Sequence, residues 1–162
     1  MNEFVPQLKV EDLWAGFPSA SHEDHSILRG LDYAVYSGEV LGLLGPSGCG
    51  KTLTALTIMG LAGKIGAKIT SGRIFFKRKN ERDCTMIDLL KIREEEYLPL
   101  RGMQISLISQ NPVSVLDPVV PVGRQLARTI AYYRGWKGRM TKAEKDELEM
   151  EMEKTLNLSG LS

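Results

Sequence analysis

The residues best suited to chemistry in this chain form a glycine-rich run that ends in a lysine and a threonine. The run matches the phosphate-loop template G-x-x-x-x-G-K-[ST] at every fixed position, and its members are Gly45, Pro46, Ser47, Gly48, Cys49, Gly50, Lys51 and Thr52. Its glycines permit a tight turn and leave the backbone N–H groups open to an anion. In this template the lysine reaches the β- and γ-phosphates of a nucleotide, and the hydroxyl binds Mg²⁺.

The segments on either side of this run decide whether the match is meaningful. Residues 40–44 are continuously apolar, as a buried parallel strand requires, and residues 53–59 can form a helix that ends at Gly60. A strand, a glycine-rich turn and a helix are the context of a working phosphate loop. The alternative, an ordinary glycine-rich turn beside a surface lysine, is disfavoured by these flanks.

The rest of the chain predicts a mixture of strands and helices. Strands are expected at residues 8–17, 27–35, 72–76 and 103–109, and helices at residues 87–97 and 123–133. A last helix should begin at Thr141, because Thr141 and Glu144 form a capping box. Its Leu148, Met152 and Leu156 recur every four residues and predict one apolar stripe.

Three polar segments contain candidate functional residues. The cluster at residues 22–25 contains two histidines, but it lacks further spaced ligands and is better interpreted as a solvated loop than as a metal site. The basic residues 77–79 could contact nucleic acid, although the acidic residues near them favour a solvated hairpin tip. Gln110 follows a predicted strand, where open α/β sheets bind ligands, and is therefore a functional candidate.

Composition limits the class of protein. The chain has 162 residues, 43% of them hydrophobic, and a net charge of +1, which favours a globular domain with no nucleic-acid partner. Its two cysteines, Cys49 and Cys84, offer no disulfide framework and suit a reducing compartment. The first residues do not resemble a signal peptide, and no apolar run has the roughly 20 residues of a membrane helix. Membrane association is therefore expected only through a partner.

With these motifs in place, the chain resembles the ATP-binding subunits of ABC transporters, and most closely the bacterial oligopeptide, dipeptide and nickel importers. The phosphate loop stands where this family has its Walker A motif, and residues 105–118 resemble the Q-loop and the segment after it. Residues 55–61 and 69–72 match the same subgroup. One departure is Cys49, where the subgroup usually has serine; a thiol at a helix N-terminus is expected to be open to alkylation.

The resemblance implies a fold and a set of site residues. The fold class would be α/β, a P-loop NTPase of ABC type with an incomplete RecA-like core, N-terminal antiparallel strands and the start of a helical subdomain. Residues 1–118 would form the nucleotide-binding core, and residues 119–162 the beginning of the helical subdomain. ATP and Mg²⁺ would bind at the phosphate loop, with Thr52 and Gln110 at the metal. Lys51 and Gln110 would take part in catalysis, and Phe17, or less favourably Trp14, would stack on adenine.

The resemblance also implies partner proteins, and it shows which family motifs are absent from residues 1–162. Partners would be membrane permease subunits, a second ABC ATPase subunit and, indirectly, an extracytoplasmic solute-binding protein, at the cytoplasmic face of the membrane. The family's signature, Walker B and switch-histidine motifs do not occur in residues 1–162. The chain is therefore expected to correspond to the N-terminal half, with residues such as Leu43 and Ile105 at an unpaired sheet edge. The alternative function is a nucleotide-binding module that does not hydrolyse ATP alone.

Overall fold

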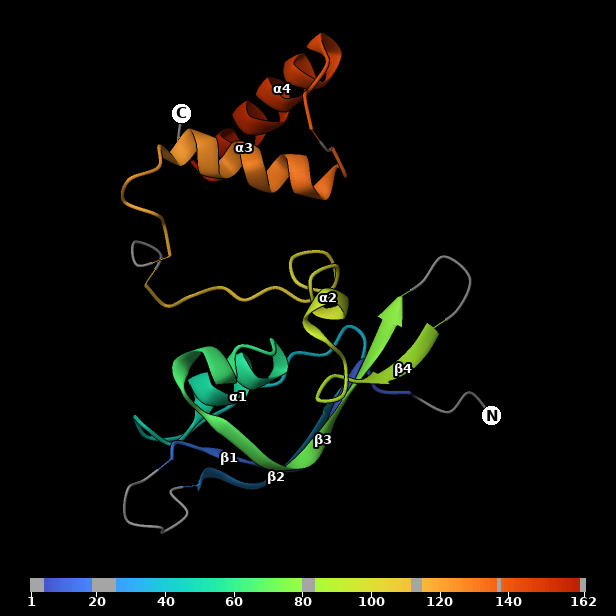
Figure 1. Ribbon diagram of the computed structural model, residues 1–162, viewed down its shortest axis with the longest axis vertical. Helices are drawn as coiled ribbons and strands as arrows, with labels where there is room; N and C mark the ends of the chain where they lie inside the picture. Colours follow the sequence, from blue (N-terminus) through green and yellow to red (C-terminus); the bar gives the residue numbers. More distant parts are fainter. Residues whose placement is uncertain (1–4, 19–25, 80–83, 112–114, 137, 161–162) are drawn as a thin grey trace. The chain divides into compact units, whose positions relative to one another are not determined.

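The computed structural model of the chain describes residues 5–18, 26–79, 84–111, 115–136 and 138–160 (Figure 1). The chain divides into two compact units, residues 1–107 and residues 108–162, and each is treated by itself. The predicted boundary between residues 118 and 119 falls inside the second unit. Within the described ranges, no helix has both the length and the apolar character needed to cross a membrane.

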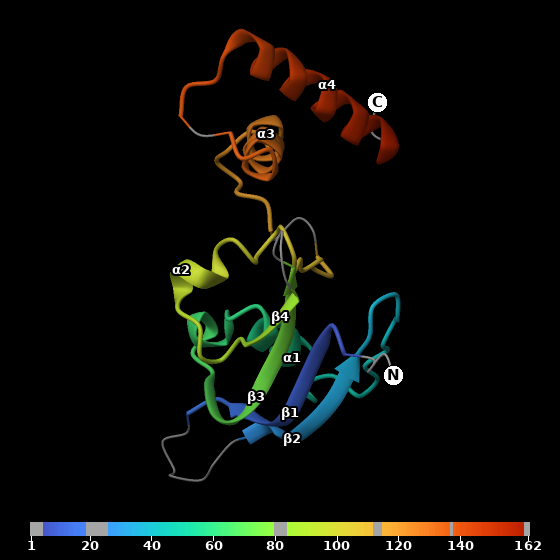
Figure 2. The ribbon, with the colours of Figure 1, turned by 90° about the vertical axis from the view of Figure 1, so that its right-hand side faces the viewer.

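The first unit is built on an antiparallel sheet. Its strands are β1 (Leu8–Gly16), β2 (Ser26–Val35), β3 (Lys68–Lys79) and β4 (Cys84–Asp88), in the order β2-β1-β3-β4, as Figure 2 shows. Each neighbouring pair is antiparallel. The prediction of N-terminal antiparallel strands is therefore confirmed. Register shifts interrupt β1 on both edges, around Asp12, whose φ of 43° is left-handed.

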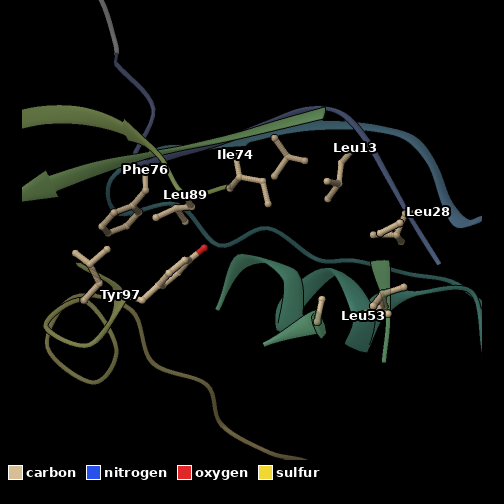
Figure 3. Close-up of a cluster of buried hydrophobic side chains, with 12 residues drawn as sticks. Leu13, Leu28, Leu53, Ile74, Phe76, Leu89 and Tyr97 are labelled. Atoms are coloured by element: carbon tan, nitrogen blue, oxygen red, sulfur yellow. The ribbon is translucent and has the colours of Figure 1, made fainter. Parts of the chain in front are cut away.

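One face of this sheet is covered by the helices that follow the phosphate loop. These are α1 (Lys51–Ile58), the short 3₁₀ helix η1 (Ala62–Ile65) and α2 (Glu94–Tyr97). The side chains between sheet and helices form one buried cluster, which Figure 3 draws as sticks with several of its members labelled. It comprises Val10, Leu13, Ala15, Leu28, Leu53, Ala62, Ala67, Ile74, Phe76, Leu89, Tyr97 and Leu100. Burial of these apolar surfaces holds α1 against the strands.

The second unit contains two helices, α3 (Val122–Tyr133) and α4 (Lys142–Leu158), which lie across one another in Figure 2. The predicted capping box is confirmed, because the Thr141 N–H donates to Glu144 Oε2 at 2.7 Å and the Glu144 N–H donates to Thr141 Oγ1 at 3.3 Å. Arg134 joins the two helices through ion pairs with Glu147 and Glu151. Neither helix has a buried residue.

Two strand predictions were wrong. Residues 40–44 and 103–109 form no ladder among the described residues, apart from an isolated parallel bridge between Arg101 and Ile105. Val40, Leu44 and Ile108 are 96%, 97% and 94% exposed. A parallel strand becomes regular and buried only when it has hydrogen-bonded neighbours and layers on both faces. The expectation that Leu43 and Ile105 lie at an unpaired sheet edge is therefore wrong, because neither belongs to the described sheet; Leu43 is 41% exposed, and Ile105 packs against the buried cluster.

The helix predicted at residues 87–97 was also wrong. Its first residues belong to β4, where Ile87 pairs with Phe76, and only Glu94–Tyr97 is helical. β3 is also longer than the predicted strand at residues 72–76, since it runs from Lys68 to Lys79. A long β3 has unpaired backbone N–H and C=O groups along its outer edge. Pairing with β4 gives these groups hydrogen-bond partners, which a short helix would not.

Candidate phosphate-binding site

The phosphate loop leads directly into the N-terminus of α1. Gly50 is the N-cap of α1, with φ of 104°, and its carbonyl accepts a hydrogen bond from the Thr54 N–H at 2.8 Å. A Cβ at position 50 would lie 2.5 Å from Leu28 Cδ2, within the core. Both the left-handed backbone and the contact with β2 therefore require glycine here. Gly48 also has a positive φ, of 81°, as a tight turn needs.

The side chain of Lys51 is hydrogen-bonded to the backbone of its own loop. Its Nζ donates hydrogen bonds to the carbonyl oxygens of Gly45 at 2.7 Å and Pro46 at 2.8 Å. It also lies 3.5 Å from the Sγ atom of Cys49, an exposed free thiol. The ammonium group is thus held at the loop by neutral carbonyl oxygens, and anionic phosphate oxygens could replace them.

The amino end of α1 is suited to an anion. No side chain caps this end, and residues 45–49 are exposed. Uncapped N–H groups at a helix start carry the positive end of the helix dipole. A glycine-rich turn that presents such groups beside a lysine can bind the phosphates of a nucleotide.

A hollow of about 440 Å³ lies beside the loop, lined by Ser26, Ile27 and Arg29 of β2 together with Gly48 and Cys49. The guanidinium of Arg29 donates to the Ser26 carbonyl at 2.9 Å. No ion pair joins Arg29 to a carboxylate in the described part of the chain. Arg29, which lines this hollow, was not among the predicted site residues, because one arginine in a strand carries no motif.

The residues at the start of α1 fit Mg²⁺ when a nucleotide is present. Thr52 is exposed and offers one hydroxyl oxygen. Mg²⁺ keeps several water ligands and binds through few protein oxygens plus substrate phosphates, so a single hydroxyl is a suitable contribution. Among the residues that the structure describes, no group of three or more His, Cys, Asp or Glu could hold a metal ion. The cluster at residues 22–25 lies outside the described residues.

The other predicted site residues lie away from this turn in sequence. Phe17 directly follows β1 and is 40% exposed. Trp14, within β1, is 36% exposed, and its Nε1 donates to Asp12 Oδ1 at 2.7 Å. Gln110 is exposed and belongs to the second unit. The structure therefore brings together residues 45–52 and β2, and the roles of Phe17 and Gln110 remain predictions.

Comparison with known proteins defines the class. The family model described as ABC transporter matches residues 28–162, which include the phosphate loop and α1. The chain therefore belongs to the ABC transporter ATP-binding family, whose members are ATPases coupled to transport.

Individual relatives show which ATP-binding proteins the sequence is similar to. The chain is 38% identical over 90% of its length to a probable peptide ABC transporter ATP-binding protein of Sinorhizobium fredii. It is 35% identical over 88% of its length to the dipeptide transport ATP-binding protein DppD of Bacillus subtilis. It is 37% identical over 72% of its length to the glutathione import ATP-binding protein GsiA of Pectobacterium atrosepticum. The matched region spans 39%, 39% and 18% of these relatives, respectively.

Proposed function

We propose that this chain provides the nucleotide-binding part of the ATP-binding subunit of an ABC importer for peptides or related small solutes. The observation that carries the proposal is the turn at residues 45–52, with Lys51 hydrogen-bonded to its carbonyl oxygens and an uncapped helix start behind it. The peptide, dipeptide and glutathione importers among the relatives support the solute class. Nickel or its chelates, the other solute of the resembling subgroup, has no comparable support among these relatives.

In the proposed mechanism the residues of the loop act on the phosphates of ATP. Backbone N–H groups of the turn bind phosphate oxygens, and Lys51 leaves the carbonyls of Gly45 and Pro46 to contact the β- and γ-phosphates. Thr52 would hold Mg²⁺, which neutralises charge on the phosphates. Phe17 would stack on adenine. Gln110 would sense the γ-phosphate and Mg²⁺, and would transmit to the permease whether ATP is bound.

The proposed partners follow from the family. A second ATPase subunit would form a dimer with this one. Two permease subunits would respond to the binding of ATP by that dimer, and a solute-binding protein would act on the other side of the membrane. The chain would then lie at the cytoplasmic face as a peripheral subunit.

A second function is a module that binds nucleotide without hydrolysing it. The exposed apolar residues Val40, Leu44 and Ile108 favour it, since the segments that contain them form no ladder in the described chain. Turnover of ATP by the purified chain, alone and with a second polypeptide that carries the remaining length of the relatives, separates the two functions. Turnover only in the mixture supports the importer subunit, and turnover in neither supports the module.

Nucleotide binding itself is tested by titrating the purified chain with MgATP. We expect saturable binding that Lys51→Ala weakens at least 100-fold, because the principal phosphate cation is removed. Lys68→Ala, which removes an exposed lysine at the start of β3, is the matched control and should bind as the unsubstituted chain does. Equal binding by the two variants would remove the basis of the proposal.

A further inference from the structure

The carboxyl end of α1 is held by one arginine from a distant part of the sequence. The Nε of Arg101 donates to the Met59 carbonyl at 2.8 Å, and its Nη2 donates to the Gly60 carbonyl at 3.3 Å. Met59 is the C-cap of α1, so these contacts satisfy carbonyls that the helix itself leaves open. A cation at this end also interacts favourably with the helix dipole.

Two further contacts fix the direction of the Arg101 side chain. Glu94 accepts two hydrogen bonds from its guanidinium, at 2.6 Å and 3.0 Å, as a bidentate pair. The hydrogen bond from Arg101 is the main reason that the pKa of Glu94 lies below its ordinary value. The guanidinium also lies over the Tyr97 ring, 4.7 Å from its centroid. Only 17% of the Arg101 side chain is exposed.

The Tyr97 ring lies between Arg101 and the core, next to Gly60 at the end of α1. Tyr97 is 5% exposed, and Figure 3 shows its hydroxyl oxygen directed into the core. A Cβ on Gly60 would lie 2.7 Å from the ring, and Gly60 has a φ of 65°. Glycine at position 60 thus lets α1 end directly against Tyr97 and Arg101.

The consequence for the phosphate loop follows from the length of α1. The helix has eight residues and is about 12 Å long, too short to be stable without tertiary contacts. Lys51 and Thr52 lie in its first turn, and the Arg101 contacts lie just beyond its last turn. A shift of the carboxyl end therefore moves the whole helix, including the residues that would face phosphate.

We propose that Arg101 is a positioning residue for nucleotide binding, which sets the place of Lys51 and Thr52 by holding the opposite end of α1. The inference rests on the proposed nucleotide-binding function. Arg101 needs the forked guanidinium as well as its charge, since Met59, Gly60 and Glu94 are contacted at the same time. Sequence reasoning missed it because Met59 and Gly60, the two residues through which it holds α1, are far from it in the chain.

The test compares MgATP dissociation constants of full-length variants at a temperature where circular dichroism shows each to be fully folded. Arg101→Ala should weaken MgATP binding by about tenfold, because α1 loses the contacts that hold Lys51 and Thr52 in place. Arg101→Lys keeps the charge without the fork and should recover part of this loss. Arg73→Ala is the matched control, because Arg73 also pairs with a glutamate, Glu11, and stacks on an aromatic ring, Phe75, without contacting α1.

The outcomes separate this inference from the function on which it rests. If the unsubstituted chain binds no MgATP, the proposed function is wrong. If it binds MgATP and folded Arg101→Ala binds equally well, with only a lower unfolding temperature, Arg101 is a stabilising residue and the positioning role is wrong. A loss shared equally by Arg73→Ala would also overturn the inference, since Arg73 does not touch α1.

Discussion

The two segments that flank the phosphate loop are both apolar in sequence, yet they differ in structure. α1, after the loop, buries Leu53, Thr54 and Thr57, whereas Val40 and Leu44, before it, are almost fully exposed. A helix satisfies its backbone hydrogen bonds internally and needs only one face covered. A strand can satisfy its backbone hydrogen bonds only through a neighbouring strand. Apolar composition alone therefore does not decide burial; the availability of partners does.

The largest expected effect is on stability and compares these segments directly. Leu53→Ala should lower the free energy of unfolding by about 2–5 kcal/mol, because it leaves a cavity between α1 and the sheet. Val40→Ala should change it by less than about 0.5 kcal/mol, because its side chain is exposed. Urea unfolding of both variants measures the difference. Equal destabilisation would show that residues 40–44 are packed in solution.

The second prediction concerns Cys49, between the two segments. Alkylation of its thiol should prevent MgATP binding while α1 stays folded, because the added group would occupy the turn beside Lys51. Binding is measured after mass spectrometry shows complete modification at position 49. Cys49→Ser, which still carries Cys84, should bind MgATP equally before and after treatment with the reagent. Retained binding by the fully modified chain would place the nucleotide elsewhere.

A third prediction uses pH to probe the core beneath α1. Burial raises the pKa of Tyr97 to about 12, from an ordinary value near 10. The folded state therefore holds the phenolic proton more tightly, and this contribution to stability is complete below pH 10 and lost as pH rises toward 12. In Tyr97→Phe, the free energy of unfolding should therefore fall less steeply between pH 10 and pH 12 than in the unsubstituted chain. Its stability at pH 8 should be at least equal, since the buried hydroxyl has no hydrogen-bond partner in the described structure.

The contribution of Tyr97 can be separated from that of Tyr33, whose pKa is also raised by burial. Tyr33 is present in both proteins, so the difference between their pH profiles belongs to Tyr97. Parallel profiles between pH 10 and 12 would mean that the Tyr97 hydroxyl reaches solvent.

The smallest expected effect lies in the second unit, where α4 has a cap but no buried residue. Thr141→Ala should lower the free energy of local opening of α4 by about 1 kcal/mol, because the Glu144 N–H loses its acceptor. Amide hydrogen exchange along α4 measures this. Thr141→Ser keeps the capping oxygen and should exchange like the unsubstituted chain. No difference between the alanine and serine variants would show that the cap is not formed.

The parts of the fold that could be predicted are the antiparallel strands β1 and β2 and the features fixed by local chemistry. The turn at residues 45–52 and the capping box at Thr141 depend on residue types at fixed short spacings, and so they were recognised. The strand predicted at residues 103–109 and the helix predicted at residues 87–97 were wrong, because the structure of these segments depends on which partner is available, and periodicity does not report that. Arg101 was missed for the same reason, because its contacts with Met59 and Gly60 come from the fold, whereas Arg29 was missed because one arginine in a strand carries no motif.

The most direct test of the account follows the backbone amides of the phosphate loop by NMR during titration with MgATP. The amide signals of Gly48, Gly50, Lys51 and Thr52 should shift and saturate together, while those of β4, at the far edge of the sheet, stay in place. Shifts confined to other residues, with the loop amides unchanged at saturation, would contradict the claim that this turn binds phosphate.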